Sequence, residues 1–185
     1  MEQLSSHPTP KELAASIAAA MRLALLDLFR QHPEQYYYFS LVTTGEALPP
    51  FLVAWSTEAL VVEVAKAKPG SEAYLRWSCA ESPYMCYGEH HFQEVIRLFE
   101  LRPEMTSEMT DSEWEAEYAV RLRAMELAMK ELDDEGVFSQ RGDREKVVIN
   151  VEVMPPDATN AERARRLNPV GSQALAAWLQ DVAEE

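Results

Sequence analysis

The chain has 185 residues, of which 47% are apolar, and a chain of this size can bury roughly 70% of its unfolded surface. These values exclude wholesale disorder and predict a single domain over residues 1–185. Acidic residues outnumber basic ones by 31 to 17, which gives a formal net charge of −14. Nucleic acids and anionic membranes attract Lys and Arg, so this charge argues against both as partners. A field of this sign would speed encounter with a basic protein, and the simpler and favoured alternative is that the charge only keeps the protein soluble.

We expect no targeting signal at the start of the chain. Residues 1–6 lack a basic region followed by a long apolar core, so we predict no signal peptide. No run approaches the roughly 18 apolar residues that a membrane span needs. Two cysteines are too few for a disulfide framework in a chain of this size. The protein is therefore expected to be soluble and cytoplasmic.

The first predicted helix begins at a capping box. Thr9 is the N-cap, Pro10 takes the first helical position, and Glu12 stands three residues after the cap. Apolar residues then recur on one helical face: Leu13, Ile17, Met21, Ala24 and Leu28. His32-Pro33 is expected to end this helix.

Two strands are predicted next, over residues 36–43 and 51–55, and the turn signals between them favour an antiparallel pair. The first strand opens with Tyr36, Tyr37 and Tyr38. Alternation along a strand would put Tyr37 on the opposite face from the other two rings. At most two rings would then share a face, which argues against a stacking platform for bases or sugars.

Two helices are predicted before the acidic middle of the chain. Ser56 is a suitable cap for a short helix that ends by Pro69-Gly70. Apolar residues at i, i+3, i+4 and i+7 predict another helix over residues 92–99. The acidic segment that follows, residues 100–117, is expected to be solvated.

A longer helix is predicted to begin at a cap on Asp111 or Ser112 and to end at Gly136. Its apolar residues alternate in steps of four and three: Trp114, Tyr118, Leu122, Met125, Met129 and Leu132. Such a stripe is usually core, and a dimer seam is the alternative. The sequence therefore leaves a monomer and a homodimer open.

The clearest strand covers residues 147–153, where Val147, Ile149, Val151 and Val153 alternate with Val148, Asn150 and Glu152. This pattern predicts one buried face and one partly wet face. Short helices are expected over residues 161–167 and 172–182. The element order predicts an α+β domain with a small, mostly antiparallel sheet of about three or more strands and helices packed on it.

Residues 76–91 hold both cysteines and two of the four histidines. Cys79, Cys86, His90 and His91 are candidate zinc ligands. The spacing of the cysteines is too long for a usual ligand pair, and adjacent histidines would point to different faces of a helix. We therefore expect no metal and no cofactor here, with the cysteines near the core and the histidines on the surface.

Four residues of this segment are the candidate binding residues: Arg76, Trp77, Glu81 and Tyr84. Arg76 and Glu81 are expected to form a charge-assisted pair beside a buried Trp77. Tyr84 is expected to be a second anchor whose hydroxyl reaches a polar partner. The alternative is a small hydrolytic or metal-dependent enzyme that uses Glu81, Cys86 and His90. The chain contains no recognised nucleophile, phosphate-loop or metalloprotease motif, which favours binding over catalysis.

The chain resembles an uncharacterised bacterial family catalogued as a domain of unknown function. Five features carry the resemblance: Thr43-Thr44-Gly45, Ser56-Thr57-Glu58-Ala59-Leu60, Arg76-Trp77-Ser78-x-Ala80-Glu81-x-x-Tyr84, the strand over residues 147–153, and Arg166-Leu167-Asn168-Pro169. The family pattern often has Pro and Trp at the positions of Cys79 and Ser82, which argues against chemistry there. Some members resemble immunity proteins encoded beside bacterial toxins. The resemblance thus implies a non-enzymatic acidic protein that occludes a basic effector. A self-associating structural protein that uses the apolar stripe from Trp114 to Leu132 is a further alternative.

Overall fold

A mixed three-stranded sheet lies at the centre of the computed structural model, which describes residues 7–182. The sheet order is β2-β1-β3, with β1 Tyr36–Thr44, β2 Phe51–Ser56 and β3 Val148–Met154. The helices are α1 Pro10–Gln31, α2 Thr57–Lys66, α3 Glu72–Leu75, α4 Gln93–Glu100, α5 Asp111–Asp134, α6 Ala158–Leu167 and α7 Gln173–Val182. Short 3₁₀ turns are η1 Glu89–Phe92, η2 Val137–Ser139 and η3 Arg144–Lys146. The six N-terminal residues, where we predict no signal peptide, lie outside the described range.

The α+β class and the antiparallel pairing of β1 with β2 are confirmed. The prediction of a mostly antiparallel sheet is wrong, because β3 pairs with β1 in parallel. A parallel neighbour needs a long crossover, and the helices between β2 and β3 supply it. None of the helices within residues 7–182 is long and apolar enough to cross a membrane.

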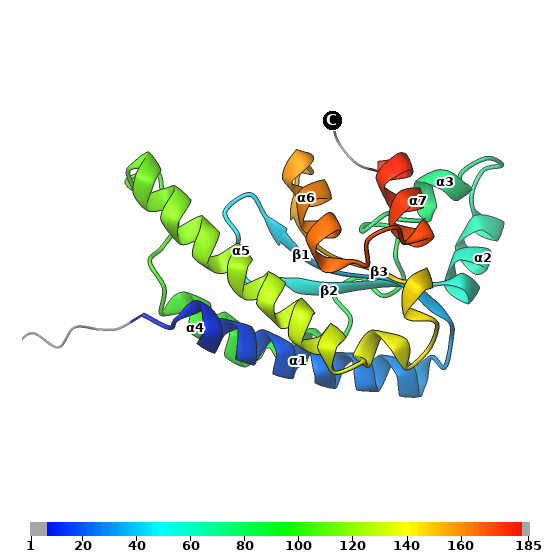
Figure 1. The fold of residues 1–185 in the computed structure, drawn as a ribbon, viewed down its shortest axis with the longest axis horizontal. Helices are drawn as coiled ribbons and strands as arrows, with labels where there is room; N and C mark the ends of the chain where they lie inside the picture. Colours follow the sequence, from blue (N-terminus) through cyan, green and yellow to red (C-terminus); the bar gives the residue numbers. More distant parts are fainter. Residues whose placement is uncertain (1–6, 183–185) are drawn as a thin grey trace, which may run out of the picture.

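Helices cover both faces of the sheet. Figure 1 shows α1 and the C-terminal part of α5 on one side, with α6 and α7 on the other. The predicted wet face of β3 is therefore wrong: Val148, Asn150 and Glu152 are all buried. An alternating pattern of apolar and polar residues predicts a strand with one face open to solvent. It therefore did not indicate that α6 packs on the second face of β3.

The helix ends follow their capping residues. Thr9 and Glu12 form the predicted capping box of α1, and Ser56 caps α2 as predicted. The long helix α5 begins one residue earlier than expected, because Thr110 accepts a hydrogen bond from the Glu113 backbone N–H and forms a second capping box.

The apolar stripe of α5 is core over its C-terminal part, as predicted. Its buried members, which lie in the layer where α5 packs on α1, are Leu122, Met125, Met129 and Leu132. A dimer seam cannot use these four, since they are already enclosed. Trp114 and Tyr118 are only half-buried and stack on each other with ring centroids 4.8 Å apart.

A bulge near the start of β1 changes the expected faces of the three tyrosines. The register shifts between Tyr36 and Tyr38, so two consecutive residues share a face. Tyr37 and Tyr38 both pack edge-on against Trp77, with centroids 5.4 and 5.6 Å away. Tyr36 instead stacks on Phe39, on the α1 side. The predicted grouping of Tyr36 with Tyr38 is therefore wrong.

The outer edge of β3 is covered by asparagine side chains rather than by a fourth strand. The Asn168 side chain accepts from the Ile149 N–H (2.9 Å) and donates to the Ile149 carbonyl (2.7 Å). The Asn160 side chain likewise accepts from the Val153 N–H (2.8 Å) and donates to the Val153 carbonyl (3.0 Å). Each amide thus satisfies both backbone groups of one edge residue, as a neighbouring strand would.

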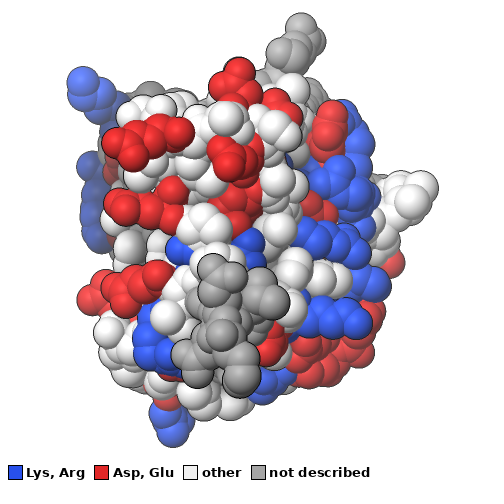
Figure 2. Space-filling view, turned by 90° about the vertical axis from the view of Figure 1, so that its left-hand side faces the viewer, with Lys and Arg blue, Asp and Glu red and all other residues white. Residues whose placement is uncertain are grey.

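The acidic segment, residues 100–117, is partly structural. Glu117 is only 4% exposed and forms ion pairs with Arg102 and Arg121, the latter at 2.8 Å. The prediction of a fully solvated segment is wrong at this residue. Figure 2, which views the molecule from the side where α4 and the start of α5 lie, shows acidic side chains in separate groups with Lys and Arg between them. This face is therefore mixed in charge.

Candidate functional site

A cleft of about 340 Å³ opens between the 73–80 segment, the end of β3, the start of α6, and α7. It is lined by Ala73, Tyr74, Trp77, Ser78, Cys79, Ala80, Glu152, Met154, Pro156, Asp157, Asn160, Trp178, Asp181 and Val182. The lining therefore joins the centre of the chain to its C-terminal helix. Clefts of this size with aromatic walls and a few polar groups are typical ligand sites.

Trp77 forms one wall and is held from three sides. The residue is only 4% exposed, its indole N–H donates to Asp181 Oδ2 at 3.0 Å, and Tyr37 and Tyr38 form edge-to-face contacts with its ring. The Arg76 guanidinium lies 5.0 Å from the Trp77 ring centroid. Trp77 thus ties the irregular 76–88 segment to both β1 and α7.

Trp178, on α7, contributes a second aromatic wall. It is 2% exposed, and within the described part of the chain its indole N–H has no hydrogen-bond partner. A buried indole N–H usually has one. This donor is therefore left unsatisfied beside the cleft.

Glu152 is a buried carboxyl group among the lining residues. It accepts hydrogen bonds from the Tyr38 hydroxyl (2.5 Å) and from Asn150 Nδ2 (3.4 Å). Burial raises the pKa of Glu152, and this effect outweighs the opposing hydrogen bonds and the charge of Arg163. Burial thus favours the neutral form of this carboxyl group.

The charged groups that line the cleft are all carboxyl groups. Glu152, Asp157 and Asp181 contribute carboxyl groups, and the described lining includes no Lys or Arg. Asp157 also caps α6 through a hydrogen bond from the Thr159 N–H at 2.8 Å. An aromatic cleft with carboxyl groups is suited to a cation.

The two cysteines lack the properties of a nucleophile. Burial raises the pKa of Cys79 to about 11, and burial also raises the pKa of Cys86. Both groups therefore stay thiols at neutral pH, whereas a thiolate is the reactive form. Cys79 lies in the cleft wall, as a small, half-buried side chain.

The structure separates the four predicted binding residues. Only Trp77 lines the cleft. Tyr84 is buried as predicted, and its hydroxyl donates to Glu34 at 2.6 Å. The predicted pair of Arg76 and Glu81 is wrong: both side chains are exposed, and within residues 7–182 they form no ion pair with each other. Arg76 packs on the Trp77 ring instead.

The histidines differ from the prediction too. His90 and His91 lie in η1, and their ring centroids are 4.0 Å apart. The expectation that they point to different faces is therefore wrong, because it assumed an α-helix. His91 Nε2 lies 2.9 Å from Asp27 Oδ2 on α1. The zinc set considered from the sequence joined these histidines to Cys79 and Cys86, whereas the structure places them beside a carboxylate.

Sequence reasoning missed Glu152, Asp181 and Trp178 as cleft residues. Glu152 had a usable signal, since a lone acidic residue within an apolar strand is unusual unless it is paired or functional. Asp181 and Trp178 had none, because only the packing of α7 brings them to Trp77. Their role depends on a contact between residues about 100 positions apart.

The raised pKa of Glu152 predicts how stability depends on pH. A carboxyl group with a raised folded-state pKa contributes stability below its ordinary value of about 4.3, and this contribution is lost as pH rises through the folded pKa. We expect Glu152→Gln to have little effect in acid and to become progressively more stable than the wild type at higher pH. The difference should reach about 1.4 kcal/mol for each unit by which the pKa is raised.

Urea unfolding of both proteins from pH 4 to pH 9 measures this difference. A constant difference across the range would show that Glu152 ionises equally easily in the folded and unfolded chains. The exposed Glu162 on α6 provides a matched control, because Glu162→Gln should give no such trend.

Comparison with known proteins gives a family but no activity. No curated protein and no solved structure matches the chain. A family model described as "Domain of unknown function (DUF4303)" matches residues 17–169, which contain β1, β2, β3 and α6. Trp178 and Asp181 lie beyond the matched range. The chain belongs to this family of unknown function, DUF4303.

Proposed function

We propose that this protein is a non-enzymatic binding protein that takes a cationic side chain of a basic protein partner into the cleft between Trp77 and Trp178. The observation that carries the proposal is the composition of the cleft, which has aromatic walls and three carboxyl groups. The net charge of −14 supports it, because a field of that sign speeds encounter with a basic partner.

Each part of the cleft has a role in this binding. A guanidinium or ammonium group over an aromatic face gains about 0.5–2 kcal/mol, and more where water is excluded. Asp181 and Glu152 provide charge-assisted acceptors for its N–H groups. The buried Trp178 indole N–H lacks an acceptor within the described residues, and a turn of the ring toward the cleft would let it donate to a backbone carbonyl of the same partner. Such a contact favours a peptide over a free amine.

Arginine is the side chain that fits best. Its planar guanidinium stacks on aromatic rings and carries several donors in fixed directions. The carboxyl groups of Asp181 and Glu152 can receive these donors from more than one side. A guanidinium already stacks on an aromatic ring at the rim of the cleft, where Arg76 lies over Trp77.

The direct test is calorimetric titration with a capped Gly-Arg-Gly peptide and with the same peptide carrying citrulline, which keeps the shape and removes the charge. We expect measurable binding of the arginine peptide and at least tenfold weaker binding of the citrulline peptide. Asp181→Asn should weaken arginine binding about tenfold while keeping the acceptor for Trp77. Asp134→Asn, which removes an exposed carboxylate on α5, is the matched control and should bind as the wild type does.

Arginine binding should also strengthen as pH rises. Burial raises the pKa of Glu152, so the group must lose a proton to pair with a cation. The pH dependence should disappear in Glu152→Gln. Equal affinity for the arginine and citrulline peptides would remove the proposal.

An immunity protein that covers a basic toxin is the more specific form of this function. The family resemblance and the acidic charge support it. In a growth assay, coexpression of the wild-type protein should relieve arrest by a basic effector encoded beside its gene. The Asp181→Asn, Glu152→Gln double variant should protect less, and equal protection would place the contact outside the cleft.

A further inference from the structure

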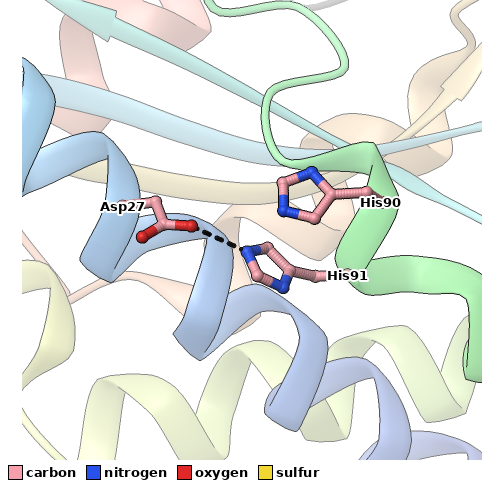
Figure 3. A group of neighbouring side chains, drawn as sticks. All are labelled: Asp27, His90 and His91. Atoms are coloured by element: carbon pink, nitrogen blue, oxygen red, sulfur yellow. Dashed lines mark hydrogen bonds and ion pairs between the residues drawn. The ribbon is translucent and has the colours of Figure 1, made fainter.

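A second cluster of chemical groups lies on the α1 side of the molecule, away from the cleft. Asp27 of α1 and His90 and His91 of η1 each offer one ligand atom, and these atoms lie within 4.8 Å of one another. Figure 3 shows the two imidazole rings side by side, both turned toward the Asp27 carboxylate. Two imidazoles and a carboxylate form a common ligand set for divalent transition metals.

The fold builds this cluster through a close approach of η1 to α1. Gly88, directly before η1, has φ of 68°, and a Cβ there would lie 2.6 Å from Ala24 Cβ. Only glycine therefore allows the chain to meet α1 at this point. Ala24 is one turn before Asp27 on the same helix, so this contact sets the histidines above the carboxylate. Buried Phe92 anchors the other end of η1.

The carboxylate is already oriented toward the histidines. Asp27 Oδ1 accepts from Arg30, which leaves Oδ2 facing His91 Nε2. The hydrogen bond from His91 is the main cause that lowers the pKa of Asp27, and Arg30 adds to it. A partner that fixes one oxygen is the usual arrangement around a metal-binding carboxylate. The Arg30 side chain is 76% exposed, so solvent screens most of its repulsion of a cation.

The distances suit a small ion. With zinc–ligand distances of about 2.0–2.1 Å, two ligand atoms of a tetrahedral site lie about 3.3 Å apart. His91 Nε2 and Asp27 Oδ2 are 2.9 Å apart, so a shift of a few tenths of an ångström would admit the ion. The exposed His90 ring can complete the set by side-chain rotation.

The cluster also opens to solvent on one side. Asp27 and His91 line a shallow cleft of about 720 Å³, together with Leu23, Leu26, Phe29, Arg30, Gln140 and Arg141. A three-ligand metal site needs such an opening, because water or another ligand occupies the fourth position. We propose that Asp27, His90 and His91 bind a divalent transition-metal ion of the zinc type through three side-chain ligands, with an open fourth position. This site is independent of the arginine-binding cleft.

The test is calorimetric titration of the untagged, metal-free protein with zinc chloride. The wild type should bind one ion, and zinc should raise its unfolding midpoint. Loss of a residue that only holds a metal ligand in place commonly weakens metal binding about 10–100-fold. Because His90 is a proposed ligand itself, His90→Ala should weaken zinc binding by at least about 100-fold. His90 is exposed, so this variant should fold as the wild type does without metal. Asp27→Asn, which keeps a hydrogen-bond acceptor for His91, should show a comparable loss.

Two controls separate this site from other zinc ligands. His7→Ala removes an exposed histidine elsewhere, and the Cys79→Ser, Cys86→Ser double variant removes both thiols; both should bind zinc as the wild type does. Loss of binding in the cysteine variant would move the site to the thiols. Unchanged binding in His90→Ala, or failure of the wild type to bind one zinc ion, would overturn the proposal.

Discussion

Replacing Asn168 by Ala is expected to destabilise the protein by about 3 kcal/mol or more. The side chain satisfies both backbone groups of the buried Ile149 on the edge of β3. Its loss leaves a buried N–H and a buried carbonyl without partners, at about 1–3 kcal/mol each. Urea unfolding followed by circular dichroism at neutral pH measures the change.

The control is Gln173→Ala, which removes an exposed amide at the start of α7 and should change stability by less than about 0.5 kcal/mol. Comparing the two stability changes distinguishes the effect of an amide that covers a sheet edge from that of an amide that only faces water. Equal stabilities of the Asn168→Ala and Gln173→Ala proteins would mean that water or a backbone shift satisfies Ile149 instead.

Glu117→Gln is expected to cost about 3–5 kcal/mol, because it breaks a buried pair and leaves the Arg121 charge without its partner. Arg121 is 3% exposed and donates to Glu117 Oε1 at 2.8 Å. Burial opposes ionisation of Glu117, but the hydrogen bonds from Arg102 and Arg121 outweigh it and hold its pKa below the ordinary range. Thermal or urea unfolding of the variant at pH 7 measures the loss.

The pH dependence of this difference has a definite sign. A depressed carboxyl pKa contributes stability above the ordinary value, about 4.3, and this contribution is lost as pH falls through the folded pKa. The gap between the wild type and Glu117→Gln should therefore be full near neutral pH and should shrink on strong acidification. Glu94→Gln is the matched control, since Glu94 pairs with Arg97 on an exposed face, where solvent screens the pair, and its loss should leave the stability nearly unchanged.

Local chemistry allowed most helices and strands to be predicted. Thr9 with Glu12, and Ser56, marked helix starts because capping depends on a few neighbouring residues. The stripe from Leu122 to Leu132 marked the core face of α5 because helical periodicity repeats along the sequence. Each of these features is confirmed.

Features that depend on long-range packing could not be predicted in the same way. The parallel pairing of β3 and the bulge at Tyr36 follow from how distant elements meet. The edge coverage by Asn160 and Asn168 requires α6 to lie beside β3. The structural role of Asn168 was therefore not indicated by the sequence pattern around it.

The candidate sites were predictable only in part. The density of aromatic and polar groups indicated the 76–91 segment, and this segment does supply Trp77 to the cleft and two histidines to the cluster with Asp27. Their partners, Asp181 and Asp27, come from helices at opposite ends of the chain. No spacing rule connects residues so far apart.

The most direct test of the arginine-binding cleft is the indole N–H region of an ¹H–¹⁵N spectrum during titration with the Gly-Arg-Gly peptide. The chain has four tryptophans, and only Trp77 and Trp178 line the cleft. Trp55 already donates to the Ser78 carbonyl at 2.8 Å, and Trp114 lies on α5. The account predicts that the Trp77 and Trp178 signals shift with the arginine peptide and stay in place with the citrulline peptide. Unmoved Trp77 and Trp178 signals, or a shift confined to Trp114, would contradict it.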